Sequence, residues 1–182
     1  DVLVTNEVID AGKLARLAAL AQRARIGVLC DDARAVPVIA AAATAAATVL
    51  DIYVEVDVGG RRCGVAPGAA VGELAQRVAG ARGLRFAGLH CYQGAAQHLR
   101  APAERRAAID AASRAAIVAR DACAARGLAV DTITGAGTGT FEFEIASGTW
   151  TELQPGSYPF MDADYARNAS APGALRFAQS LY

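Results

Sequence analysis

Short runs of apolar residues alternate with longer amphipathic stretches along most of the chain, and this alternation limits the folds that the chain can adopt. We expect helices between the runs, for example at residues 11–23, 71–81 and 102–126. The runs expected to form strands are residues 1–5, 26–30, 52–57, 84–92, 130–134 and 149–153. Strands that alternate with helices of this length predict βαβ units and a parallel sheet, so the pattern indicates an α/β fold.

Polar or glycine-rich clusters follow nearly every predicted strand, as at residues 57–63 and 92–94. In a closed (β/α)₈ barrel the carboxyl ends of all strands meet at one rim, where active sites lie. In an open doubly wound sheet, the other fold that fits the pattern, only the strand ends near the reversal of strand order would meet. The clusters favour the barrel. Because only six strands are visible, we expect a partial barrel with about six of eight βα units.

Composition bears on the partners and the cellular location of the chain. Lys+Arg and Asp+Glu are equal at 18 each among the 182 residues, so the net charge gives no support for nucleic-acid binding. The longest apolar run, residues 36–50, contains Pro37 and is too short for a membrane span. The four cysteines lack Cys-x-x-Cys spacing, which indicates reduced thiols in a cytoplasmic protein. Since the first residue is Asp1 rather than Met, we expect the chain to be an excerpt of a longer one.

Two glycine-rich segments follow the last two predicted strands. Residues 134–140 (Thr-Gly-Ala-Gly-Thr-Gly-Thr) could turn backbone N–H groups and hydroxyls toward an anion, although a flexible loop is the alternative. Residues 154–158 (Gln-Pro-Gly-Ser-Tyr) could do the same, and here the alternative is a type II turn. Phosphate sites recur after the last two strands of barrels. Together the two segments therefore predict a phosphate site.

Two further side chains are candidates at the rim. Arg62 follows the third predicted strand and could pair with a phenolate or a carboxylate; an exposed loop arginine is the alternative. Tyr92 ends the fourth predicted strand, where its ring could pack on a flat cofactor or belong to the core. A catalytic thiol at Cys63 or Cys91 is disfavoured because neither has a histidine base beside it in the sequence.

The remaining titratable side chains suggest structural roles. His90 lies inside a predicted strand and is expected in the core, and His98 is expected in a loop or cap. Glu142 and Glu144 are expected to be solvated charges on an extended segment. No group of histidine, cysteine and carboxylate residues has metal-ligand spacing, so the sequence assigns no metal ligand. The pair at residues 31–32, two aspartates, is expected to cap the helix that follows.

Several segments, in order along the chain, resemble the D-threonine aldolase family, which includes 3-hydroxy-D-aspartate aldolase and, more distantly, D-serine dehydratase. The likeness runs from residue 1 to about residue 168, and the segments that carry it are residues 1–6, 55–65, 92–98, 134–140, 152–158 and 160–165. The family belongs to the alanine-racemase-like group of pyridoxal-phosphate enzymes.

The resemblance implies an N-terminal (β/α)₈ barrel that holds pyridoxal phosphate and a C-terminal β-domain. Residues 1–168 would be an incomplete barrel without its first two strands, and residues 169–182 would begin the connection to the missing β-domain. The family's Schiff-base lysine lies on the absent first strand, so no catalytic residue is assigned to this chain. Lys13, its only lysine, is on a predicted helix and does not take that role. The ligands of the family's divalent metal (Mn, Mg or Zn) lie in the absent domain.

Carried over by position, the family pattern assigns cofactor contacts to nine residues. It places Arg62 beside the phenolic oxygen of the cofactor, Tyr92 against its pyridine ring and Gln154 near the ring nitrogen. The residues implied around the phosphate are Thr134, Gly137, Thr138, Gly156, Ser157 and Tyr158.

For the full-length parent, the resemblance implies retro-aldol cleavage of a D-β-hydroxy-α-amino acid, such as D-threonine or D-3-hydroxyaspartate, to glycine and an aldehyde. The substrate would be a small molecule, and the parent a homodimer or a monomer. Three alternatives stay open: a D-serine dehydratase of the same family, a non-catalytic pyridoxal-phosphate-binding module and a self-standing phosphate-binding α/β domain. A six-stranded piece of a barrel would leave two unpaired edges, so we expect the isolated chain to be inactive and to aggregate.

Overall fold

A computed structural model describes residues 1–161 and 163–170 of the chain, and residues 171–182 of the expected connection lie outside this part. Strands and helices alternate along it as the sequence predicts. The elements are β1 (Val2–Glu7), α1 (Ala11–Leu20), β2 (Ile26–Cys30), α2 (Ala35–Ala45), β3 (Leu50–Glu55), α3 (Ala69–Ala79), β4 (Leu84–Cys91), the 3₁₀ helix η1 (Ala95–His98), α4 (Pro102–Ala124), β5 (Ile133–Gly135), α5 (Phe141–Ser147), β6 (Glu152–Leu153) and α6 (Ala163–Ala166).

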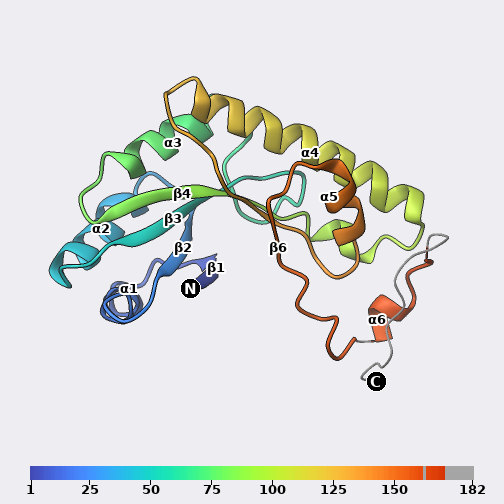
Figure 1. Cartoon of the computed structure of the whole chain (residues 1–182), viewed down its shortest axis with the longest axis horizontal. Helices are drawn as coiled ribbons and strands as arrows, with labels where there is room; N and C mark the ends of the chain where they lie inside the picture. The colour runs from blue at the N-terminus through green and yellow to red at the C-terminus, as the bar shows by residue number, and fades with distance from the viewer. Residues whose placement is uncertain (162, 171–182) are drawn as a thin grey trace.

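The six strands form one sheet in the order β1-β2-β3-β4-β5-β6, and every neighbouring pair is parallel. A doubly wound sheet reverses its strand order at one point, whereas here each strand pairs with the next one along the chain. The connecting helices follow one another along the outer side of the curved sheet (Figure 1). This arrangement is that of part of a (β/α)₈ barrel and confirms the predicted fold. Within the described residues, β1 and β6 are its two edges.

The central strands are buried on both faces, as their nearly continuous apolar sequences predict. Every residue of β2 and of β3 is buried. Val28 of β2 lies in register with Ile52 of β3, and both are fully inaccessible to solvent. In parallel sheets, strands that are covered by helices on one face and by packed side chains on the other have such continuous apolar sequences.

Helix α2 begins differently from the sequence expectation, and the prediction of an aspartate cap is wrong. Arg34 occupies the cap position and makes no side-chain capping bond. The Asp32 carboxylate instead accepts hydrogen bonds from the backbone N–H and guanidinium of Arg34. Asp31 accepts from the backbone N–H of Gly64, in the loop after β3, at 3.1 Å. Asp31 therefore bonds away from the helix start, and Asp32 bonds to Arg34, just before the first helical residue.

The segment with Glu142 and Glu144 is a helix, α5, and not the extended stretch that we expect from its alternating pattern. Phe143 and Glu144 are both buried, because they lie on a helix that packs against α4 rather than on opposite faces of a strand. The expectation of a solvated Glu144 is thus wrong. Its burial raises the pKa of the carboxyl to about 7. Among the described residues, no helix is both long and apolar enough to cross a membrane.

Candidate functional site

A pocket of about 260 Å³ opens at the carboxyl ends of the strands. Its lining side chains come from elements far apart in the sequence but adjacent in the sheet. They are Thr5 of β1, Arg62 after β3, His90 of β4, Tyr92 after β4 and Gln154 after β6. Three of the sequence candidates, the arginine, the tyrosine and the glutamine, therefore meet in one cavity. The right-handed βαβ connections of a parallel sheet bring all of these ends to the same side.

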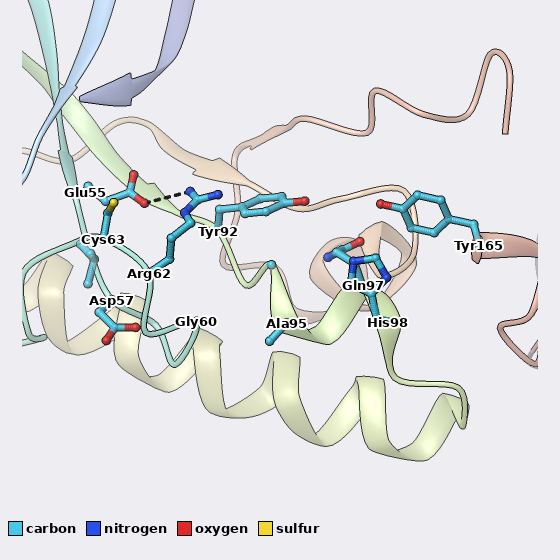
Figure 2. A pocket seen from close by; sticks show the side chains of 12 residues that line it. Glu55, Asp57, Gly60, Arg62, Cys63, Tyr92, Ala95, Gln97, His98 and Tyr165 are labelled. Carbon is cyan, nitrogen blue, oxygen red and sulfur yellow. Dashed lines mark ion pairs between the residues drawn. The ribbon is translucent and has the colours of Figure 1, made fainter. Parts of the chain in front are cut away.

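The Arg62 guanidinium lies between a carboxylate and an aromatic ring (Figure 2). Its Nη2 is 3.6 Å from Oε1 of Glu55, a buried residue at the end of β3. The guanidinium carbon lies 5.8 Å from the centre of the Tyr92 ring. Burial raises the pKa of the Tyr92 hydroxyl. These contacts hold the arginine at the rim, where a guanidinium can bind an oxyanion.

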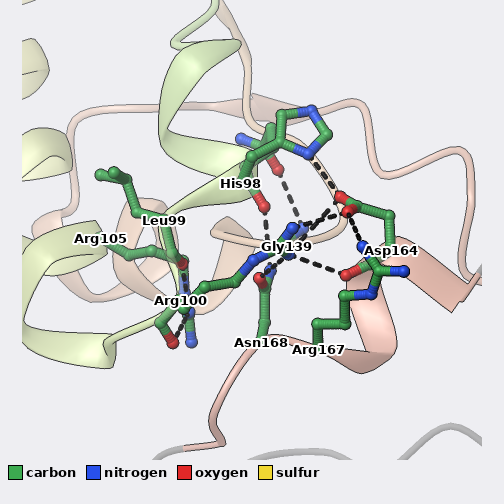
Figure 3. A network of polar contacts seen from close by, with 9 residues as sticks. His98, Leu99, Arg100, Arg105, Gly139, Asp164, Arg167 and Asn168 are labelled. Carbon is green, nitrogen blue, oxygen red and sulfur yellow. Dashed lines mark hydrogen bonds and ion pairs between the residues drawn. The ribbon is translucent and has the colours of Figure 1, made fainter.

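A second cavity, of about 350 Å³, shares Arg62 and Tyr92 with the first. Its far wall is Tyr165 of α6, whose hydroxyl points toward that of Tyr92 (Figure 2). Asp164 holds α6 in place: its carboxylate contacts Nη2 of Arg100 and Nδ1 of His98, each at 2.6 Å (Figure 3). The Arg100 and His98 contacts lower the pKa of Asp164 to about 2. His98 of η1 thus anchors α6 and also lines this second cavity.

The two glycine-rich segments lie against each other. The hydroxyl of Thr138 accepts a hydrogen bond from the backbone N–H of Ser157 at 3.1 Å. A Cβ built on Gly156 would meet no atom within 4 Å, so this backbone is open to a ligand. Tyr158 is more than half exposed, and no described contact directs its ring toward the loops.

Gln97 of η1 supports the first of these loops and is a residue that sequence reasoning missed. Its Oε1 accepts from the backbone N–H of Gly139 at 2.9 Å, and its Nε2 donates to Thr140 at 2.7 Å. A Cβ on Gly137 would lie only 2.3 Å from Gln97 Oε1. Glycine at this position therefore lets a buried amide pass beside the loop, a close approach that the glycine spacing alone could not reveal.

Thr134 and Gln154 lie at the ends of the last two strands and bond to each other. Gln154 Nε2 donates to Thr134 Oγ1 at 2.7 Å, and Thr134 Oγ1 donates to Glu152 at 2.6 Å. On its other side, Gln154 Oε1 lies 3.3 Å from Nε2 of His90. His90 is buried, as expected, but it also lines the pocket, and its Nδ1 contacts the Glu55 carboxylate without a hydrogen bond of regular geometry.

All four cysteines are free, and their environment does not favour nucleophilic chemistry. Burial raises the pKa of Cys30 and of Cys123 to about 11, and it raises that of Cys91 further. The ligand atoms of Glu7, Asp31 and Cys63 lie within 4.8 Å of one another, a grouping that sequence spacing could not show. Within this group, Glu7 Oε1 is buried and has no hydrogen-bond partner among the described residues.

The fold and the rim together define a class: α/β-barrel proteins with a pocket at the carboxyl ends of their strands. The chain belongs to the family of the alanine racemase N-terminal domain, whose model matches residues 4–164. This is a family of pyridoxal-phosphate-dependent proteins.

Two named relatives are similar in sequence to all or nearly all of this chain. It is 44% identical to a D-threonine aldolase from Arthrobacter sp. over 182 residues, which is 100% of this chain and 48% of that protein. It is 47% identical over 174 residues to a 3-hydroxy-D-aspartate aldolase from Paracoccus denitrificans (strain Pd 1222), covering 95% of this chain and 45% of that protein. The chain thus spans about half the length of these curated relatives.

Solved structures share the arrangement of strands and helices. The crystal structure of D-threonine aldolase from Filomicrobium marinum superposes with a TM-score of 0.95 at 48% identity, over 98% of this chain and 48% of that one. D-threo-3-hydroxyaspartate dehydratase from Delftia sp. HT23 has a TM-score of 0.75 at 21% identity, over 91% of this chain and 44% of that one. The second likeness concerns the fold alone.

The residues present fit a pyridoxal phosphate molecule in chemical character. The pocket offers an aromatic ring at Tyr92, a cation at Arg62 and an amide at Gln154, and these suit a planar ring that carries a phenolate and a nitrogen. The paired loops offer hydroxyls and the open backbone at Gly156, which suit a phosphate. The chain's single lysine, Lys13, is exposed on α1 and lies outside both cavities.

Proposed function

We propose that the complete gene product is a pyridoxal-phosphate-dependent lyase. It would cleave D-β-hydroxy-α-amino acids, with D-threonine and D-3-hydroxyaspartate as the expected substrates, to glycine and an aldehyde. The observation that carries this proposal is the convergence of Arg62, Tyr92 and Gln154 in one pocket beside the paired glycine-rich loops. Identity of 44% and 47% to two named aldolases supports the choice of reaction.

Pyridoxal phosphate, when bound, supplies an electron sink for the charge that Cα–Cβ cleavage leaves on the amino acid. In this proposal, Arg62 binds the phenolic oxygen and Tyr92 lies against the ring. Gln154 faces the ring nitrogen through its amide. Arg62 can hold its place because Glu55 lies behind it at 3.6 Å.

Six residues from the two loops and their strands are proposed to bind the phosphate. Backbone N–H groups that point outward from a glycine-rich turn bind anions well, and the bond between Thr138 and Ser157 fixes the separation of the two loops. The proposed phosphate contacts are Thr134, Gly137, Thr138, Gly156, Ser157 and Tyr158.

Two groups that the reaction needs are assigned to no residue of this chain. The lysine that anchors the cofactor is not Lys13, which is exposed on α1. The divalent metal (Mn, Mg or Zn) that would assist removal of the β-hydroxyl proton is likewise given no ligand here. We propose that other parts of the gene product supply both, that the protein works in the cytoplasm on small amino acids, and that it is a homodimer or a monomer.

The test is an assay of the complete gene product with pyridoxal phosphate and Mn²⁺ on D-threonine and D-3-hydroxyaspartate. Formation of glycine and the matching aldehyde supports the proposal. Release of pyruvate and ammonia from D-serine, without glycine from D-threonine, would assign a dehydratase instead. Cofactor binding with no turnover on any of the three would assign a non-catalytic binding module.

A further inference from the structure

Five side chains form a continuous row of polar contacts, and two of them, His90 and Gln154, line the pocket. Thr134 Oγ1 donates to Oε1 of Glu152 at 2.6 Å, and Gln154 Nε2 donates to Thr134 Oγ1 at 2.7 Å. Gln154 Oε1 lies 3.3 Å from His90 Nε2, and His90 Nδ1 contacts Oε2 of Glu55. The row thus begins and ends at a carboxylate.

The direction of each bond in the row follows from the protons available. A threonine hydroxyl has one proton, and Thr134 gives it to the Glu152 carboxylate, which can only accept. Thr134 therefore accepts from Gln154, and this bond turns the NH₂ group of the glutamine amide toward Thr134. The amide oxygen must then face His90. If the Gln154 amide were flipped, its oxygen would face the accepting oxygen of Thr134, and its NH₂ group would face His90 Nε2.

His90 consequently stands between two acceptors, the Gln154 oxygen on Nε2 and the Glu55 carboxylate on Nδ1. A neutral imidazole has only one N–H and can satisfy one of them, whereas an imidazolium donates to both. The His90 and Glu55 side chains are only 2% and 3% exposed. A buried imidazolium needs a compensating charge, and the Glu55 carboxylate supplies it.

Glu55 also contacts the other side of the pocket. Its second oxygen, Oε1, lies 3.6 Å from Nη2 of Arg62. The buried Glu55 carboxylate, at the end of β3, therefore lies next to Arg62, the residue that we propose binds the phenolic oxygen of the cofactor. Through His90, it also acts on the amide proposed for the ring nitrogen.

We infer that Glu55 is a positioning residue for the cofactor: its carboxylate keeps His90 doubly protonated, which fixes the Gln154 amide, and at the same time it orients Arg62. This inference rests on the proposed function, because it gives Glu55 its role through two side chains assigned to the cofactor. Neither Glu55 nor His90 is given a direct part in bond cleavage.

Removal of the negative charge has a defined consequence. In Glu55→Gln the imidazolium loses its counter-charge, and His90 becomes neutral with one ring proton. If that proton stays on Nδ1, Nε2 becomes an acceptor and faces the Gln154 oxygen without a bond. The amide is then free to turn.

The experiment compares the complete gene product with its Glu55→Gln variant, both loaded with pyridoxal phosphate. We expect the visible absorbance of the bound cofactor to shift in the variant. We expect kcat to fall roughly 10- to 100-fold, the usual loss when a group that orients a ligand is removed. Glu73→Gln, on the exposed face of α3, is the matched control and should change neither quantity. An absorbance of the variant equal to that of the unmodified protein would overturn the inference.

A second measurement tests the histidine directly and does not depend on the cofactor. The ¹⁵N NMR signals of His90, assigned with a His90→Gln variant, should show two protonated ring nitrogens in the unmodified protein at neutral pH and one in Glu55→Gln. One proton in the unmodified protein overturns the inference even if Glu55→Gln fails to fold. Two protons in a protein that binds no pyridoxal phosphate would instead reject the proposed function and leave the Glu55–His90 pair in place.

Discussion

The hydroxyl of Thr138, which follows β5, accepts a hydrogen bond from the backbone N–H of Ser157, which follows β6, at 3.1 Å. This bond joins the two glycine-rich loops that the sequence separates by a helix and a strand. It fixes the distance between backbone groups that we propose to bind the same phosphate. We therefore propose that the two loops act as one anion site rather than as two independent turns.

The bond between the loops gives a first prediction. Thr138→Val keeps the shape of the side chain but removes the acceptor, so the loops are held less firmly. A hydrogen bond of this kind contributes about 0.5–1.5 kcal/mol, and we expect the Kd for pyridoxal phosphate to rise about 2- to 10-fold. Fluorescence titration of the complete gene product measures this change. Thr138→Ser keeps the acceptor and should bind as the unmodified protein does; equal weakening in both variants would contradict the proposed role.

Two glycines of the loops should respond differently to the same substitution. In Gly137→Ala the new Cβ meets the buried amide of Gln97 at 2.3 Å, and we expect a loss of stability of about 1–3 kcal/mol. In Gly156→Ala the Cβ meets no protein atom within 4 Å, so folding should be unaffected while the Kd for the cofactor rises. Thermal unfolding with and without pyridoxal phosphate separates the two effects. Equal stability of the two variants would show that Gln97 does not constrain the loop.

The raised pKa of Glu144 should make the free energy of unfolding depend on pH. Its folded pKa of about 7 lies above the ordinary value of 4.5, so between these pH values the folded chain holds a proton that the unfolded chain releases. Its contribution to stability is complete below about pH 4.5 and is lost as the pH rises through about 7. The loss amounts to roughly 3 kcal/mol. We expect Glu144→Gln, which mimics the protonated form, to match the unmodified protein at pH 5 and to exceed its unfolding temperature at pH 8.

The control for this prediction is a glutamate at the surface. Glu73→Gln, on α3, should leave the difference in unfolding temperature between pH 5 and pH 8 as it is in the unmodified protein. If Glu144→Gln keeps the full pH dependence, the carboxyl is not the source of it.

The sheet edge at β1 gives a further prediction. Val2 is 54% exposed, and within the described residues β1 pairs on one side only. Strands with unpaired backbone groups and apolar side chains associate with other chains. We expect the 182-residue chain, expressed alone, to self-associate as its concentration rises, and Val2→Lys to reduce this association. Light scattering after size-exclusion chromatography measures it, and a monomer at all concentrations would show that the edge is covered.

The sequence predicts the fold well because its strands carry a strong local signal. Residues 26–30 have the strand boundaries expected from five apolar or small residues in a row, and Pro102 begins α4 as expected. The fifth strand is shorter than the predicted residues 130–134, since only Ile133–Gly135 pair with β4. Strand length depends on pairing with neighbours, which a single run of sequence does not contain.

The candidate site was predictable only in part, because some of its contacts join residues that are far apart in the sequence. Arg62, Tyr92 and Gln154 can be placed at one rim because parallel strands end on the same side. Gln97, Glu55 and the row of polar contacts through His90 depend on residues that meet across the sheet. Glu144 shows the same limit, because its burial follows from the packing of α5 against α4 and not from its own charge.

A crystal structure of the complete gene product with pyridoxal phosphate tests whether the loops and the rim residues form one cofactor site. We predict the phosphate between the backbone at Gly137–Thr138 and that at Gly156–Ser157, with Arg62 at the phenolic oxygen and Gln154 at the ring nitrogen. A phosphate bound elsewhere, with these residues away from the ring, would contradict the proposed site.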